Sequence, residues 1–466
     1  MKKLHPLITI CALVALSSLW SCNDNNNPVN SPSITKFTAP GDTTIQIGGK
    51  ISIETEVDNE GGVEYTWLVN NDKVANTKDY LFEPSTPGHY TISFIASAKN
   101  GYESRTITVL AMKYWGGFFI INEGNFGSTP GSINYFYPAT ATSDASLLTD
   151  IYAQSNPGKD LGLTAEYGTV WGDKIYVVSK GDAWSGNTNS KLYCINAYDM
   201  KLVSTIDVIP ADFGYAYAFA GIDKEKGVLT TNKGAYIVNL GDNMTMGNLL
   251  AGSDAVDTSD PDAVACGAVA VAGNNIFVIN QIEGIMVYSK TNFAYEGSMG
   301  MASVGFAKDK DGNLWAANTT ELVKIETRLV PHALRIALPA GVEIHDSWIS
   351  WNAGSLCASI NENAIFFAQT GQFGGGNEIY KYVEGNDASL NAPFATGGSM
   401  DAFYGSALSV NPSTGDLVVN YVDPGFGAPQ SKNRIVLYDS KTGAEKSRFV
   451  YPQDDYWYPA MTVYQK

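Results

Sequence analysis

The sequence contains few of the residues that carry most catalytic and nucleic-acid chemistry. Its 466 residues include only four histidines and five cysteines, and 30 Lys and Arg stand against 47 Asp and Glu. The resulting net charge of −17 repels phosphate backbones, so we expect no nucleic-acid partner. Charged residues make up only 17% of the chain, whereas Gly, Tyr and Trp are frequent. This balance suits an extracellular all-β protein.

The sequence motifs of common hydrolases and nucleotide-binding enzymes are absent as well. No G-x-S-x-G, H-E-x-x-H or G-x-x-x-x-G-K-[ST] occurs. His345 stands next to Asp346, but adjacent residues on a strand point to opposite faces, which argues against a catalytic dyad. The stretch "DKDG" at 309–312 looks like part of a calcium loop, yet a tight turn between strands explains it better. We therefore expect a binding protein with no catalytic residues, no metal site and no cofactor.

The cysteines follow no zinc-binding spacing. Only Cys194, Cys266 and Cys357 lie beyond position 22, and two of them sit inside strand-like runs. Buried free thiols are the expected state, with a disulfide as the alternative.

The first residues have the features of a targeting segment. Lys2 and Lys3 precede an apolar run, "LITICALVALSSLW", that is too short to span a bilayer comfortably. The run leads into "LWSC", which ends at Cys22 and resembles a bacterial lipobox. That resemblance implies a lipoprotein signal peptide over residues 1–21 and lipidation of Cys22; an ordinary secretory signal is the alternative. The polar "NDNNNPVNSPS" that follows indicates a flexible tether over residues 22–33.

A self-contained β-rich segment follows the tether. The runs "KISIETEV", "VEYTWLVN" and "HYTISFIASA" alternate apolar and polar residues, as half-buried strands do. Trp67 lies in the middle of one run, where a sandwich keeps a large core residue. "YTWLVN" and "PGHYTISFIASAKNG" resemble the Y-x-W and G-x-Y-x-V segments of PKD-like immunoglobulin domains. We therefore predict a PKD-like, Ig-like β-sandwich over residues 34–112, which serves as a spacer.

The remaining residues, 113–466, contain a repeated pattern. Runs of β-formers such as "FFIIN", "IFVIN" and "LWAAN" close on a polar residue. Seven runs do so, ending at Asn122, Ser179, Asn232, Asn280, Asn318, Asn361 and Asn420. Each run has strand-like neighbours, and four short antiparallel strands repeated around a ring describe a propeller blade.

The two ends of this region complement each other. The first repeat lacks an inner strand of its own, whereas "AMTVY" near the C-terminus is a lone inner strand. Pairing the two would close the ring and remove the free sheet edges. The predicted fold is therefore all-β, an Ig-like sandwich followed by a seven-bladed β-propeller closed by a C-terminal strand. A second sandwich is the competing all-β interpretation.

The repeats also resemble a known family. "IFVIN…GIMVYS" is similar to the YVTN repeat of β-propellers, and "FFIINEGNFG" resembles the first blade of a group of Bacteroidetes lipoprotein propellers. Several members of that group are surface proteins, and the best understood bind cobalamin beside a TonB-dependent outer-membrane transporter. The resemblance implies a lipid-anchored outer-membrane protein that captures cobalamin or a related corrinoid for such a transporter. The alternatives are a carbohydrate- or protein-binding propeller and a cation-dependent hydrolase or lyase.

Two sets of residues are candidates for ligand contact. The repeated Asn residues would ring one face, but we expect most of them to hydrogen-bond their own loops, with Asn122 and Asn420 as exceptions. Aromatic residues unique to their blades could grip a bulky, partly apolar molecule. These aromatic candidates are Tyr167, Trp184, Tyr215, Tyr217, Trp348, Phe373, Tyr404, Phe426 and Trp457.

Replacing Cys22 by Ala tests the predicted anchor. The variant lacks the thiol that would carry the lipid, so it should move from the membrane fraction to the soluble fraction. Cys11→Ala, which changes a cysteine within the apolar run, is the matched control and should remain in the membrane fraction. Unchanged membrane association of Cys22→Ala would contradict the lipoprotein prediction.

Overall fold

The computed structural model describes residues 31–58, 61–125, 127–182, 189–260, 263–345, 356–371, 374–455 and 457–465. These residues divide into two compact units, which we describe separately. The first unit comprises residues up to 44, 48–84 and 89–110, and the second comprises 45–47, 85–88 and 111 onward. No helix within the described ranges is both long and apolar enough to cross a membrane.

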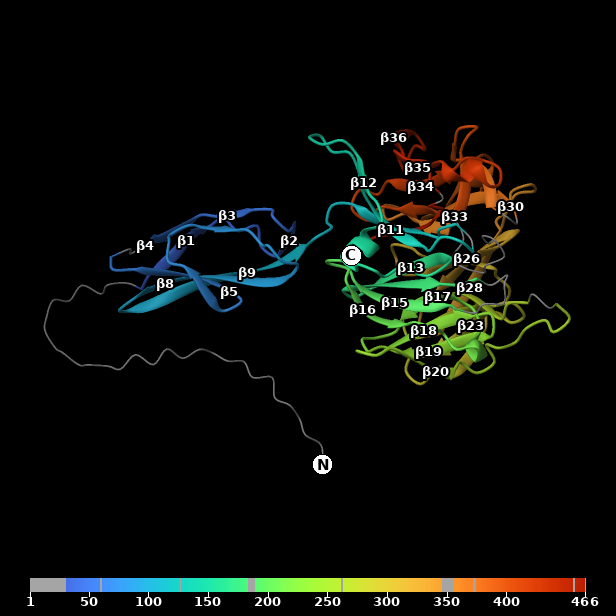
Figure 1. Cartoon of the computed structure of the whole chain (residues 1–466), viewed down its shortest axis with the longest axis horizontal. Coiled ribbons are helices and arrows are strands. Elements are labelled where there is room, and N and C mark those ends of the chain that lie inside the picture. The colour runs from blue at the N-terminus through green and yellow to red at the C-terminus, as the bar shows by residue number, and fades with distance from the viewer. Residues whose placement is uncertain are drawn as a thin grey trace, which may run out of the picture. The chain divides into compact units, whose positions relative to one another are not determined.

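The first unit is a small β-sandwich. Its main sheet has the strand order β2-β9-β8-β5-β6, and two further pairs, β1-β4 and β3-β7, lie opposite (Figure 1). The strand bounds are β1 Ser33–Phe37, β2 Thr43–Gln46, β3 Ile51–Ile53, β4 Thr55–Asp58, β5 Glu64–Val69, β6 Asp72–Ala75, β7 Tyr80–Phe82, β8 Gly88–Ala98 and β9 Gly101–Met112.

Trp67 joins the layers of this sandwich. It is fully buried on β5, and its ring lies 4.7 Å from Phe94, 5.2 Å from Tyr80 and 6.2 Å from Phe37, measured between ring centroids. Its indole Nε1 donates to the Thr77 carbonyl at 3.0 Å, so the one polar atom of the ring is satisfied. The strand-centred tryptophan thus has the core position that the sequence pattern predicts.

The second unit is a β-propeller built from groups of four antiparallel strands, which we call blades. Most blades are separate sheets, but a parallel bridge between Ser406 and Met461 joins the last blade to the first in one eight-stranded sheet. Figure 1 follows the strands from cyan β11 through green to the red β34–β36, which return beside β11 and β12. Blades 2 to 5 consist of β13 Ala165–Trp171, β14 Lys174–Ser179, β15 Lys191–Asn196 and β16 Leu202–Ile206; β17 Ala216–Gly221, β18 Lys226–Thr231, β19 Gly234–Asn239 and β20 Thr245–Leu249; β21 Cys266–Ala272, β22 Asn275–Asn280, β23 Gly284–Ser289 and β24 Tyr295–Ser298; and β25 Val304–Lys308, β26 Leu314–Asn318, β27 Glu321–Glu326 and β28 His332–Ala337.

The remaining strands form blades 6, 7 and 1. Blade 6 contains β29 Leu356–Ala358, β30 Ala364–Gly371, β31 Gly374–Val383 and β32 Ala395–Thr396, and blade 7 contains β33 Ala402–Val410, β34 Leu417–Val422, β35 Asn433–Tyr438 and β36 Glu445–Val450. Blade 1 contains β10 Phe118–Asn122, β11 Ser132–Tyr137 and β12 Ser146–Leu148, with β37 Pro459–Val463 as its inner strand. Short helical turns lie at α1 Ile151–Ser155, η1 Ala211–Phe213, η2 Asp387–Leu390 and η3 Ala428–Ser431.

The second strands of the blades are apolar throughout because both of their faces are covered. On β22, Ile276 and Val278 pack in one buried cluster while Phe277 and Ile279 pack in another. All six residues of the strand are buried. A strand between two neighbouring sheets therefore shows a continuous apolar run, which is the repeat visible in the sequence.

The C-terminal strand closes the ring, as predicted. β37 pairs antiparallel with β10, joining Phe119 to Val463, Ile120 to Thr462 and Ile121 to Met461. Beyond the strand, the Glu123 and Gly124 N–H groups donate to the carbonyls of Tyr458 and Trp457 at 2.9 and 3.2 Å. The last residues of the chain thus complete the sheet begun by the first repeat.

The polar residues that close the second strands mostly serve their own loops. Asn280 Oδ1 accepts from the N–H groups of Ile282 and Glu283 at 2.9 Å, and its Nδ2 donates to the Ser253 and Ala255 carbonyls at 2.9 Å. The same local role is seen where Asn318 accepts from Thr320 N–H at 2.9 Å and Asn232 accepts from Tyr215 N–H at 2.7 Å. This confirms the structural role expected for these asparagines.

The sixth repeat corrects the sequence prediction. "LCASIN" was predicted to be a second strand, but Leu356–Ala358 is the first strand of blade 6, and Asn361 lies in the turn before β30. Ser359 Oγ accepts from the N–H groups of Asn361 and Glu362 at 3.1 and 3.3 Å, which forms a side-chain-supported turn. The second strand of this blade, β30, ends at Gly371 without an asparagine.

The cysteines agree with the sequence prediction. Cys194, Cys266 and Cys357 are all free thiols, and burial raises the pKa of the Cys266 thiol to about 12. Cys194 and Cys266 are buried and Cys357 is half-buried, and burial raises the pKa of all three thiols, which keeps them unreactive.

Deleting residues 459–466 tests the closing strand. The deletion removes the backbone pairing of β10 and the burial of Ala460 and Val463, a loss of roughly 5 kcal/mol or more. The propeller should therefore melt far lower or aggregate through the exposed edge of β10. Removing only Gln465 and Lys466 leaves β37 intact and is the matched control. A calorimetric scan in which the long deletion melts like the control would show that closure does not depend on β37.

Candidate ligand-binding site

A pocket of about 420 Å³ opens among the loops of blades 6 and 7. It is formed by the start of β31, the segment leading into β33, and the loop after β34. Its lining residues are Gly375, Gly376, Asn377, Ser399, Asp401, Ala402, Phe403, Tyr404, Val422, Asp423, Pro424, Gly425, Phe426 and Gln430. A volume of this size suits a small molecule or one end of a larger one.

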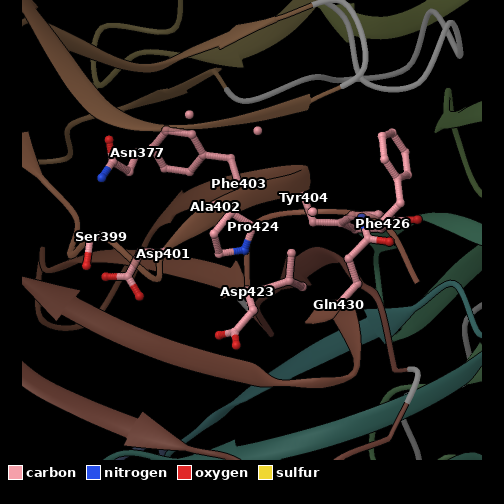
Figure 2. A pocket seen from close by; sticks show the side chains of 14 residues that line it. Asn377, Ser399, Asp401, Ala402, Phe403, Tyr404, Asp423, Pro424, Phe426 and Gln430 are labelled. Atoms are coloured by element: carbon pink, nitrogen blue, oxygen red, sulfur yellow. The ribbon is translucent and has the colours of Figure 1, made fainter. Parts of the chain in front are cut away.

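The pocket has a buried floor and an exposed aromatic rim. Asp401, Phe403 and Tyr404 are buried, whereas the side chain of Phe426 is 75% exposed on a loop rich in Gly and Pro. Figure 2 shows Asn377, Ser399 and Asp401 together on one side of the pocket, and Phe426 and Gln430 on the other. A ligand in the pocket would therefore meet polar groups on one side and a ring on the other.

Two arginines fix the acidic part of the floor. Arg434 bonds to Asp423 and lies 2.9 Å from Asp401, which also accepts from Arg448 at 2.9 Å. Burial alone would raise the pKa of Asp401, but the hydrogen bonds from Arg448, Arg434 and the Gly398 N–H outweigh it and hold that pKa below its ordinary value. The floor is therefore an ionised, hydrogen-bonded network that holds the neighbouring loops in place.

A second group of charges lies behind the pocket wall, where blades 7 and 1 meet. The Tyr404 hydroxyl makes a short hydrogen bond to the Glu123 carboxyl, although the two residues are 281 positions apart in the chain. Tyr404 also packs against Tyr458, with ring centroids 5.0 Å apart. Tyr458 has a φ of 49°, a left-handed backbone conformation that is costly for a residue with a side chain and recurs at functional sites.

The Glu123 carboxyl is the most perturbed acid of this group. Burial, and next the negative charge of Glu166, raise the pKa of Glu123 to about 8, although Tyr404 and Lys180 oppose the shift. Burial also raises the pKa of Tyr404. The pair therefore keeps at least one proton near neutral pH.

The charges continue into blades 2 and 3. Lys180 forms an ion pair with Glu166, and its Nζ lies 5.2 Å from the centre of the Tyr217 ring. This buried ammonium thus has both a carboxylate and an aromatic face as partners. Burial raises the pKa of Tyr217, so its hydroxyl stays neutral.

The structure sorts the predicted ligand residues into three groups. Tyr404 and Phe426 line the pocket. Trp184, Trp348, Phe373 and Cys22 fall outside the described residues. The third group lies inside the fold or packs against its core. Tyr167 belongs to the core of blades 2 to 4, Tyr217 is buried beside Lys180, and the partly buried Trp457 packs on the core between blades 7 and 1.

Asn122 and Asn420 also depart from the expectation. Both are completely buried, where their Nδ2 atoms donate to Ser132 Oγ at 3.0 Å and Thr462 Oγ1 at 2.8 Å. Neither residue lines the pocket, because both side chains point between blades 1 and 7. Tyr215 is half-buried and contributes its backbone N–H to the Asn232 side chain.

Sequence reasoning missed the charged residues of the site. Glu123 lies within the "INEGNF" motif that carries the family resemblance. The motif therefore pointed to this stretch of the chain, but it gave no sign that the carboxyl group is buried and paired. Arg434 and Asp423 carry no local signal, because their roles come from the pairing of strands within blade 7, where Arg434 bonds to both Asp423 and Asp401. Glu123, by contrast, meets its partner Tyr404 through closure of the ring.

Comparison with known proteins agrees on family and fold. Residues 116–465 match the family described as "Domain of unknown function (DUF5074)". No curated protein matches the chain. A solved "quinonprotein alcohol dehydrogenase-like protein" from Bacteroides thetaiotaomicron is similar, with a TM-score of 0.53 and 19% identity over 90% of this chain and 96% of that one. A second protein from that organism, of unknown function, gives a TM-score of 0.37 and 11% identity over 95% and 94% of the two chains, too low to bear on the fold.

The sheets, the closing strand and the loop pocket define a β-propeller protein similar to one from Bacteroides. More particularly, the chain belongs to the DUF5074 family, whose domain covers the whole propeller.

The pH dependence of stability tests the state of Glu123. Its pKa of about 8 in the folded protein lies above the unfolded value of roughly 4.3, so folding favours the protonated acid. The resulting stability is fully present below the unfolded pKa and is lost as the pH rises through the folded one. Between pH 5 and pH 8 the free energy of unfolding should fall by on the order of 2 kcal/mol or more from this group.

Glu123→Gln isolates that contribution. The amide keeps the shape and the acceptor for Tyr404 but cannot ionise, so the variant should lose less stability than the unchanged protein over this pH range. Denaturant titrations at pH 5, 6.5 and 8 measure the difference. If the free energy of unfolding changed equally with pH in the two proteins, Glu123 would ionise as an ordinary carboxyl group.

Proposed function

We propose that this protein captures a small molecule at the loop pocket of its propeller and passes it to an outer-membrane transporter. The observation that carries the proposal is the pocket itself, with an exposed Phe426 above a buried, hydrogen-bonded floor. Such a combination gives a ligand both an aromatic contact and fixed polar partners.

Cobalamin or a related corrinoid is the first-choice ligand. The support is the resemblance of the "FFIINEGNFG" stretch to the cobalamin-binding propeller lipoproteins. A corrinoid is larger than the pocket, so the pocket would hold one part of it. The rest would lie across the rim beside Phe426. The neutral amide groups of a corrinoid suit the Asn, Ser and Gln side chains of the lining.

A carbohydrate is the second candidate ligand. A buried carboxylate such as Asp423 can accept hydrogen bonds from hydroxyl groups, and an exposed ring such as Phe426 can stack on the apolar face of a sugar. The third hypothesis, a cation-dependent hydrolase or lyase, has weaker support. Glu123 has the raised pKa of a candidate general acid, but it does not line this pocket.

The proposed location is the outer face of the outer membrane. The lipobox ending at Cys22 and the polar tether behind it support a lipid anchor. The proposed partner is a TonB-dependent transporter in the same membrane, which would receive the ligand from the propeller.

Titration with cyanocobalamin tests the proposal directly. The unchanged protein should bind it, and Phe426→Ala should weaken binding about thirtyfold. Removing an aromatic ring that stacks on the ligand and is buried by it costs roughly 2 kcal/mol, and each 1.4 kcal/mol is tenfold in affinity. Isothermal titration calorimetry measures both constants.

Tyr102→Ala supplies the matched control, because Tyr102 is 71% exposed but belongs to the first unit. This variant should bind like the unchanged protein. A panel of oligosaccharides, titrated in parallel, separates the two ligand classes: binding of a glycan but not of cyanocobalamin would favour the second. If Phe426→Ala left the affinity for the bound ligand unchanged, the pocket would not be the binding site.

A further inference from the structure

The interface that closes the ring, between blades 1 and 7, contains an unusual polar layer. Its apolar part consists of Phe118, Ile120 and Phe136 from blade 1 against Val418 and Ile435 from blade 7. Strand alternation places further residues on these same faces. They are Asn122, Ser132 and Asn134 from blade 1, Thr462 from the closing strand, and Asn420, Asn433 and Tyr451 from blade 7. We call these seven residues the closure seam.

The seam differs from a comparable interface elsewhere in the ring. Between blades 4 and 5, Phe277, Ile279 and Val287 pack against Leu314 and Val323, and the buried Asn275 of the same strand bonds within its own blade, to Glu296 at 2.6 Å. At the seam, by contrast, polar side chains replace apolar ones at completely buried positions, since Asn122, Asn134 and Asn420 are all 0% exposed. A polar layer in a core is costly unless each group is hydrogen-bonded.

Several seam atoms have no such partner among the described residues. The unpaired acceptors are the Oδ1 atoms of Asn122, Asn420 and Asn433. The Asn134 side chain and the Tyr451 hydroxyl are partners of each other. Buried polar groups in folded proteins nearly always find a partner, so three unpaired oxygens in one interface call for an explanation.

The register brings these atoms close to one another. Thr462 lies opposite Ile120 and therefore diagonal to Asn122 on the same face, and its hydroxyl accepts from Asn420 at 2.8 Å. Asn420 lies opposite Ile435 and diagonal to Asn433. Asn134 lies opposite Ile120 and diagonal to Asn122. The amides of the seam thus form a chain of neighbours across the interface.

We propose that the closure seam is a binding site for internal water molecules that bridge the two blades. A buried water typically makes about three hydrogen bonds to groups that lack other partners. Here it can donate to Asn122 Oδ1 and Asn420 Oδ1 on opposite blades, and it can accept from the Tyr451 hydroxyl, which has its own proton to donate.

Water fits this site better than a metal ion does. A cation could use the three amide oxygens, but no carboxylate belongs to the seam, so a buried ion would lack a counter-charge. Water is neutral and donates hydrogen bonds, which is what the three unpaired oxygens require.

The seam has a structural consequence for the ring. β10 and β34, which carry Asn122 and Asn420, also lead into Glu123 and Asp423 at the functional site. Apolar contacts tolerate small shifts between two sheets, whereas hydrogen bonds are directional. Waters that bridge the two blades would therefore fix the register between the last blade and the first. The inference does not depend on which ligand the pocket binds.

A crystal structure at a resolution better than about 1.8 Å provides the direct test. Ordered water should appear at hydrogen-bond distance from both Asn122 Oδ1 and Asn420 Oδ1. Amides that pair directly with each other and exclude solvent would overturn the proposal. So would a peak with anomalous signal after a rubidium soak, since that would identify a cation.

A solution measurement extends the test to variants. Asn420→Leu fills the seam with an apolar group of similar size, and oxygen-17 relaxation dispersion should then count at least one fewer long-lived internal water than in the unchanged protein. Asn318→Leu is the matched control, because Asn318 has a local loop role and lies outside the seam. An unchanged count for a folded Asn420→Leu protein would contradict the proposal.

Discussion

The antiparallel pairing of β37 with β10 is the interaction on which the rest of the propeller depends. It joins residues 459–463 to residues 119–122, more than 300 positions earlier in the chain, and no other strand supplies the inner edge of blade 1 in the described residues. Without it, the inner edge of β10 would be exposed, and blades 1 and 7 would lose the part of their interface that β37 supplies. The cost of this contact is entropic, because pairing segments so far apart in the chain closes a long loop.

Closure also assembles the chemistry of the site. It brings Tyr404 of blade 7 to Glu123 of blade 1, sets the Tyr458 ring against Tyr404, and places both in front of the Glu166–Lys180 pair. The pocket on blade 7 therefore rests against a wall of buried ionisable groups, while the Arg434 network holds its floor. These ion pairs fix the positions of the side chains and add little net stability, because the desolvation of two charges offsets their attraction. Removing one partner is destabilising, since it leaves the other charge buried without a partner.

Much of the fold followed from local pattern. Apolar second strands, the position of Trp67 and the lone strand "AMTVY" all reflect burial that is decided within one or two strands, so the sequence predicts them directly. The prediction that Asn361 ends a second strand was wrong, because the sequence does not distinguish an asparagine in a turn from one at the end of a strand. The candidate site was predicted in part, because Tyr404 and Phe426 line the pocket whereas Tyr167 and Tyr217 are buried in the fold. Glu123 gained its role from Tyr404, a partner in a distant repeat, and Asp423 and Arg434 gained theirs from strand pairing within blade 7.

The central claim is that ring closure by β37 holds the functional site in place. Hydrogen–deuterium exchange of the full chain tests it most directly. The amides of β37, and those of Glu123 and Gly124 that donate to the Tyr458 and Trp457 carbonyls, should exchange as slowly as those of β22 in the middle of the ring. Fast exchange of these amides while β22 remains protected would contradict the account, because it would show a stable ring whose closing strand is open.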